Sequence, residues 1–199
     1  MKKLFLLSAF AFFGVLQAQT EKGNWVIGGS TNLGFNSVTT TYKYDGRSAD
    51  GPKISTFNFT PSVAYFVDDN IAVGVDISYA SITQKYEYDG GSDEKYTTST
   101  FSLMPTATYY FKSAGKALPY LGAGLGVASS KEDDGYDDYT TTGFAWKAKG
   151  GVVILLNQTV GLDLGLSYTN TNGKNKDNDD LKIKTGAVGV TAGISVFLK

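Results

Sequence analysis

Hydrophobic and polar residues alternate with a period of two along most of the chain after residue 24. Such alternation puts successive side chains on opposite faces of an extended strand, and it predicts strands with one apolar and one polar face. In residues 71–79, for example, Val73, Val75 and Ile77 alternate with Gly74 and Asp76. Eight segments follow this pattern: residues 25–35, 57–67, 71–79, 101–111, 119–127, 144–152, 160–168 and 188–198. Each has about the length that a tilted strand needs to cross a lipid bilayer.

The connections between these segments alternate in length. Short polar connections lie near residues 68–70, 113–115 and 157–158, and long polar ones span residues 37–55, 81–98, 128–141 and 169–181. An even number of strands with short turns on one side and long loops on the other is the layout of an outer-membrane barrel. The predicted fold is therefore all-β: an eight-stranded antiparallel up-and-down transmembrane β-barrel.

The composition of the polar face separates this prediction from a soluble barrel. A soluble, lipocalin-like binder also alternates, but it needs many charges on its exterior. Here the polar face is mostly Gly, Ser, Thr, Asn and Ala, which suits a narrow lumen. Aromatic residues lie on the apolar face near strand ends, as in the aromatic girdles of membrane barrels: Trp25, Tyr65, Tyr79, Phe111 and Tyr168.

The first twenty residues have the three parts of a secretory signal. Lys2 and Lys3 are followed by an apolar run over residues 4–15, and Ala18 is a suitable residue before the cleaved bond. The apolar run is too short to span a bilayer as a helix. We expect residues 1–18 to be a signal peptide and residues 19–199 to be the barrel domain.

Four charges lie well inside the predicted strands, and all of them fall on the polar face: Asp76, Lys147, Lys149 and Asp163. Their signs balance, and counting from the short connections puts them at similar depth. Because an isolated ion in a narrow lumen carries a desolvation penalty of several kcal/mol, we expect them to pair. The hypothesis is a lumenal charge cluster that plugs the barrel, and the alternative is four charges in ordinary lumen water.

The last strand breaks its own pattern at Lys182 and Lys184, which share the parity of the apolar residues after them. Either a bulge near Gly186 resets the alternation, or this stretch lies above the membrane.

The composition argues against several kinds of chemistry. The chain contains no histidine and no cysteine, which removes the usual general base and the commonest metal ligand. The net charge of −1 gives no electrostatic case for a nucleic-acid partner. The glycines between Gly122 and Gly126 lack the spacing of a nucleotide-binding loop and lie inside a strand. We expect no catalytic residues, no cofactor and no resident metal.

Two loop features leave binding open. The acidic stretch from Glu132 to Asp138 could hold a cation or could simply be solvated. Tyrosines, which make rigid amphipathic contact surfaces, are spread over the long connections: Tyr42, Tyr44, Tyr86, Tyr88, Tyr96, Tyr136 and Tyr139. These residues could meet an external ligand, or they could belong to strands and loops that project above the lipid.

Three stretches carry a resemblance to a known family: residues 118–127 (LPYLGAGLGV), 144–152 (FAWKAKGGV) and 191–199 (TAGISVFLK). In order and spacing they resemble the small outer-membrane β-barrels that include the OmpA transmembrane domain and OmpX. The closer resemblance is to the Bacteroidetes-type outer membrane protein beta-barrel domain. It implies a place in the outer-membrane lipid bilayer and insertion by the assembly machinery, which reads a terminal aromatic residue. This chain departs from that pattern, because Leu198 and Lys199 follow Phe197.

The sequence therefore predicts a non-enzymatic outer-membrane protein with a structural or surface-contact role for its long loops. The alternative is a narrow porin-like channel for ions or small solutes, which would require the charge cluster to be absent or to open. A closed barrel has no free sheet edge, so we expect a monomer.

Overall fold

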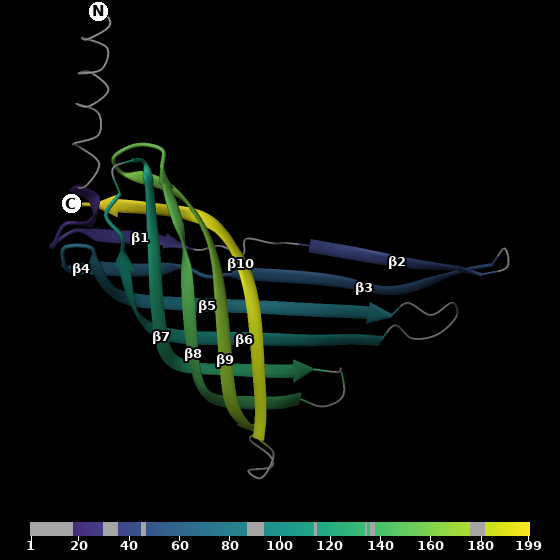
Figure 1. The fold of residues 1–199 in the computed structure, drawn as a ribbon. Helices are drawn as coiled ribbons and strands as arrows, with labels where there is room; N and C mark the ends of the chain where they lie inside the picture. Colours follow the sequence, from purple (N-terminus) through teal and green to yellow (C-terminus); the bar gives the residue numbers. More distant parts are fainter. Residues whose placement is uncertain are drawn as a thin grey trace, which may run out of the picture.

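The computed structural model describes residues 18–29, 36–44, 47–86, 94–113, 115–133, 135, 138–175 and 182–199. These residues form one short 3₁₀ helix, η1 (Ala18–Thr20), and ten strand segments in a single antiparallel sheet (Figure 1). The segments are β1 (Trp25–Gly29), β2 (Asn36–Tyr44), β3 (Arg47–Phe59), β4 (Ser62–Asp68), β5 (Ile71–Tyr86), β6 (Glu94–Tyr110), β7 (Ala117–Asp133), β8 (Asp138–Leu155), β9 (Val160–Asn175) and β10 (Lys182–Leu198). Nearly all of the predicted signal peptide lies outside the described residues, so its removal stays a prediction.

The ten segments make a ring of eight strands. β3 and β4 are two parts of one strand, because both pair with β5 in the same register on either side of Pro61. Proline has no backbone N–H to give to the sheet, which accounts for the interruption. β1 and β2 together occupy the next position in the ring, because β1 pairs with β4 and β2 pairs with β3. The ring closes where β1 meets β10, with Trp25 opposite Leu198, and the predicted eight-stranded up-and-down barrel is confirmed.

The apolar face of the strands points outward, as predicted. Leu121, Leu125 and Leu166 are each about 60% exposed although they lie in the middle of regular strands. Such a continuous apolar exterior is stable only when something other than water covers it. Among the described residues, no helix is both long and apolar enough to cross a membrane.

Aromatic residues mark both edges of this apolar band. Near the short turns, the rings of Trp25 and Tyr65 lie 5.1 Å apart. At the opposite edge, Trp146 and Tyr168 lie 5.3 Å apart. This is the arrangement of the two interfacial girdles of a membrane barrel. We call the end of the barrel with the short turns the turn end and the other the hairpin end.

The long connections were predicted as loops, and this was wrong for most of their length. Residues 37–55, 81–98, 128–141 and 169–181 lie largely in strands: β2, β3 and the extended ends of β5 to β10. Above the apolar band both faces of a strand are in contact with water. The sequence there has no alternation of hydrophobic and polar residues from which a strand could be predicted. Thr, Tyr and Ser dominate these stretches, and Thr and Tyr favour strands. In Figure 1, β2 and β3 form the longest of the resulting hairpins.

The parity break in the last strand has a simple resolution. β10 pairs with β9 in one unbroken register from Lys182 to Val196, so no bulge lies near Gly186. Lys184 is exposed and lies opposite Asn172, beyond the apolar band. Of the two alternatives, the stretch above the membrane is the one that agrees with the structure.

Candidate functional site

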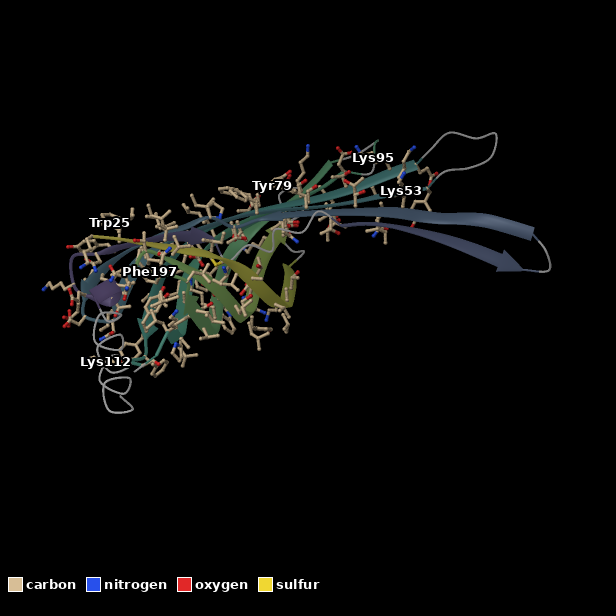
Figure 2. The ribbon with its side chains drawn as sticks, turned by 90° about the horizontal axis from the view of Figure 1, so that it is seen from above. Trp25, Lys53, Tyr79, Lys95, Lys112 and Phe197 are labelled. Atoms are coloured by element: carbon tan, nitrogen blue, oxygen red, sulfur yellow. The ribbon has the colours of Figure 1, made fainter. Side chains whose placement is uncertain are left out.

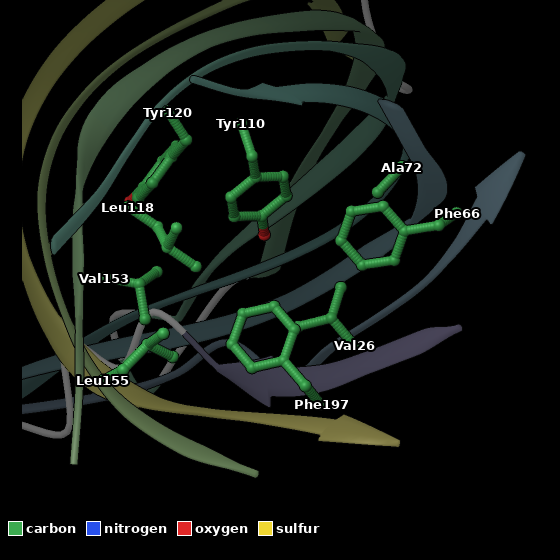
Figure 3. Packing of buried hydrophobic residues seen from close by; sticks show 9 residues of the cluster. All are labelled: Val26, Phe66, Ala72, Tyr110, Leu118, Tyr120, Val153, Leu155 and Phe197. Atoms are coloured by element: carbon green, nitrogen blue, oxygen red, sulfur yellow. The ribbon is translucent and has the colours of Figure 1, made fainter. Parts of the chain in front are cut away.

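The lumen at the turn end is filled by apolar side chains. Nine buried residues from seven strands pack there, and we call them the turn-end cluster (Figure 3): Val26, Phe66, Ala72, Tyr110, Leu118, Tyr120, Val153, Leu155 and Phe197. The ring centroid of Phe66 lies 5.4 Å from that of Tyr110 and 6.4 Å from that of Phe197. Phe66 and Val153 are 0% exposed. The prediction that small residues line the lumen is therefore wrong at this level, because bulky side chains fill the interior of this small barrel.

The chain before β1 covers the rim of this end. The Thr20 hydroxyl donates to Oδ1 of Asn70 at 2.8 Å, and the Asn70 backbone N–H donates to the Thr20 carbonyl at 2.7 Å. The Gln19 amide donates to the backbone carbonyl of Gln158 at 3.1 Å. These bonds tie the segment to two short turns, because Asn70 and Gln158 belong to different ones. The segment and the turn-end cluster close this end together.

Two lysines and an aspartate form a second level of closure above the cluster. The ammonium of Lys147 lies 3.1 Å from Oδ2 of Asp76, and that of Lys149 lies 3.2 Å from the same oxygen. Asp76 comes from β5 and both lysines come from β8, with β6 and β7 between them in the sheet. The ion pairs therefore span the lumen. Asp76 is only 2% exposed, so its charge depends on these partners rather than on water.

Asp163, which lies opposite Val153 on the neighbouring strand, is held by hydroxyl groups. The Tyr120 hydroxyl donates to Oδ1 of Asp163 at 2.7 Å, and the Ser195 hydroxyl donates to Oδ2 at 3.4 Å. Two glycines give Tyr120 its space: a Cβ at Gly165 would come within 2.6 Å of the tyrosine oxygen, and one at Gly151 within 2.8 Å. The absence of side chains at these two positions of β8 and β9 thus leaves room for the phenol ring of Tyr120.

The structure places all four predicted site residues in the lumen, where Asp76, Lys147 and Asp163 are buried. It joins both lysines to Asp76, whereas Asp163 is bound by Tyr120 and Ser195. Sequence reasoning missed the part that Tyr120 plays. A signal existed, because Tyr120 has the inward parity of β7 and is far larger than the glycines that follow it on that face.

The loop features are described only in part. In the acidic stretch, residues 134, 136 and 137 lie outside the described residues, and the described part of the chain holds no group of three or more acidic side chains that could bind a metal ion. Of the predicted contact tyrosines, Tyr86 and Tyr96 pack edge to face across β5 and β6 at 6.0 Å. Tyr139 is 47% exposed. Tyr88 and Tyr136 lie outside the described residues, as do the side chains of Tyr42 and Tyr44.

Comparison with known families agrees with this architecture. The family model described as "Outer membrane protein beta-barrel domain" matches residues 4–195. The chain belongs to this family. Its resemblance to small outer-membrane barrels, inferred from three short motifs, is therefore confirmed, and the protein is located in the lipid bilayer of the bacterial outer membrane.

Solved structures of outer-membrane barrels share the fold. Neisserial surface protein A is 20% identical with a TM-score of 0.52, over 87% of this chain and 94% of that one. The outer membrane protein OprG from Pseudomonas aeruginosa is 16% identical with a TM-score of 0.50, over 90% of this chain and 98% of that one. No curated protein matches the chain. In barrels of this kind the short turns face the periplasm and the long connections face the outside of the cell.

Proposed function

We propose that this outer-membrane protein is a non-enzymatic, monomeric barrel that is closed to solutes and acts through the hairpins above the lipid. The observation that carries the proposal is the filling of the lumen at two successive levels. The turn-end cluster occupies the first, and the ion pairs of Asp76 cross the second. A barrel closed twice is poorly suited to conduction, which leaves its external surface as the part that can act.

The hairpins supply that surface. β5 continues for seven residues beyond the girdle, from Tyr79 to Tyr86, which is roughly 20 Å of strand. In Figure 2 the labels of Lys53 and Lys95 lie far along these extensions from Trp25 at the turn end. Hydroxyl groups pair across the strands here, as Thr83 and Thr97 do at 3.3 Å. A stiff, polar, tyrosine-bearing surface of this kind is suited to contact with another molecule or cell.

Single-channel conductance of the refolded protein in a planar bilayer tests the closure. We expect no conductance from the wild type. A variant carrying Asp76→Ala and Asp163→Ala should still be silent, because the turn-end cluster remains. Adding Phe66→Ala and Phe197→Ala should open a pore. Steady conductance by the wild type would contradict the proposal and support a narrow channel instead.

Shortening one hairpin tests the surface role. Ser81 and Ser99 are opposite each other in β5 and β6, so residues 82–98 can be replaced by an Asn-Gly turn without changing the register below. Cells displaying the short form should settle more slowly than wild-type cells, because they lose cell-to-cell contacts. A control with Thr83→Ser and Thr97→Ser keeps the full hairpin. Equal settling of the short form and the control would count against a contact role for this hairpin.

A further inference from the structure

A cavity of about 120 Å³ lies in the lumen next to the ion pairs of Asp76. Its described walls include Lys147 and Lys149 together with hydroxyl side chains, among them Ser78, Ser167 and Thr191. The register explains this composition, because Lys149 lies opposite Ser167 on the neighbouring strand. The cavity is thus bounded by donors that come from strands on several sides of the ring.

The charged groups that line this cavity are both positive. Lys147 and Lys149 bind Asp76, and the carboxylate of Asp163 lies nearby, so the four buried charges balance. Each ammonium has three N–H donors, and the one bond from Lys147 to Asp76 uses only one of its three. No carboxylate is among the described residues that line the cavity. Asp163, whose charge balances the second lysine, accepts a hydrogen bond from the Tyr120 hydroxyl and does not itself line the cavity.

The position of the cavity favours entry from outside the cell. Ser78 follows Asp76 by two residues in the direction of the hairpin end, whereas the turn-end cluster lies on the other side. A second cavity of about 130 Å³, whose walls include Thr171 and Thr185, lies farther along the same strands. The lumen above the ion pairs therefore contains polar cavities, one of them with Glu132 in its wall, beside a small buried apolar cluster of Met104, Ala128 and Ala145.

We infer that this cavity binds a small oxyanion, such as phosphate or a carboxylate, from the extracellular side. Charge-assisted hydrogen bonds from lysine are among the strongest that a protein makes to such groups, and neighbouring hydroxyls can donate to the remaining oxygens. The volume holds several water molecules, which is also the space of an anion with four or five heavy atoms. The bound anion accepts from the lysine N–H donors that Asp76 leaves unused.

Isothermal titration of the refolded protein in detergent tests the site, with inorganic phosphate and acetate as separate probes and chloride at equal ionic strength in both. We expect saturable binding of at least one probe in the millimolar range. Lys149→Met should weaken it by about tenfold or more. Lys112→Met is the matched control, because it removes one exposed lysine from a short turn, and it should leave binding unchanged.

Asp76→Asn tests the same site by a change that should strengthen anion binding instead of weakening it. It removes the carboxylate that competes for both lysines, so the same probe should bind several-fold more tightly. If Lys149→Met fails to fold, as judged by heat-modifiable gel mobility, Thr191→Val takes its place and should weaken binding without touching a charge. Absence of binding by both probes would overturn the inference. So would equal effects of the Lys149 and Lys112 variants, or weaker binding by Asp76→Asn.

Discussion

Near the short turns the lumen is packed with aromatic and aliphatic side chains, whereas just above them it is crossed by ion pairs and lined by hydroxyls. Both regions lie on the same inward face of the same strands. The lower one resembles the core of a soluble protein, where stability comes from the removal of apolar surface from water. The upper one depends on charges that must satisfy one another, since removal of any partner leaves an ion without compensation.

The difference shows that alternation determines which face a residue occupies but not how that face is filled. An inward position can be held by phenylalanine, glycine or lysine, depending on its height in the barrel. The two regions should therefore respond differently to substitution.

The largest loss is expected in the upper region. Asp76→Ala should reduce the free energy of unfolding by about 4 kcal/mol, because two lysines are left in the lumen without their shared partner. Urea unfolding in lipid vesicles measures this. The quadruple variant Asp76→Leu, Lys147→Met, Lys149→Met and Asp163→Asn should recover most of the loss, since it removes all four buried charges. A quadruple variant as unstable as Asp76→Ala would show that the charges are not the cause.

In the lower region the loss should be somewhat smaller and should follow volume. Leu155→Ala removes a side chain that is 1% exposed and should reduce the free energy of unfolding by about 3 kcal/mol. Leu166→Ala is the matched control on the outer face, where lipid chains can fill the space that alanine leaves. The same urea titration compares the two. Equal losses would mean that the turn-end cluster is not packed as a core.

The boundary between the regions should give the smallest effect. Gly165→Ala puts a Cβ against the Tyr120 hydroxyl, and it should reduce the free energy of unfolding by about 2 kcal/mol. In a Tyr120→Phe background the same change should do less harm, although the Thr191 hydroxyl, 2.8 Å from that Cβ, remains, and a double-mutant cycle detects the difference. Gly115→Ala serves as control, because nothing lies within 4 Å of a Cβ there. Strict additivity of the two changes would contradict the proposed contact.

Much of this arrangement could be predicted from the sequence. Parity alone put Asp76, Lys147 and Lys149 on one inward face, and the eight-stranded ring followed from alternation and connection length. The turn-end cluster was missed in part because Leu155 lies in an unbroken apolar run, residues 152–156. In such a run, hydrophobicity does not distinguish the inward-facing residues from the outward-facing ones. The pairing of Tyr120 with Asp163 could not be predicted, since it depends on curvature that brings β7 and β9 together across β8. Strands that project above the lipid were left open as an alternative, but their extent was missed because strands in water on both faces carry no hydrophobic period.

The pairing of Trp25 with Leu198 joins the first strand to the last. Until the final strand is present, both ends of the sheet expose unpaired backbone groups that lipid cannot satisfy. The contact that completes the barrel is therefore also the one with almost the largest sequence separation in the chain, and such contacts form slowly. We therefore expect closure of the barrel to be a late step that needs both β1 and β10. Until that step the apolar band has neither lipid nor a complete ring of partner strands to cover it.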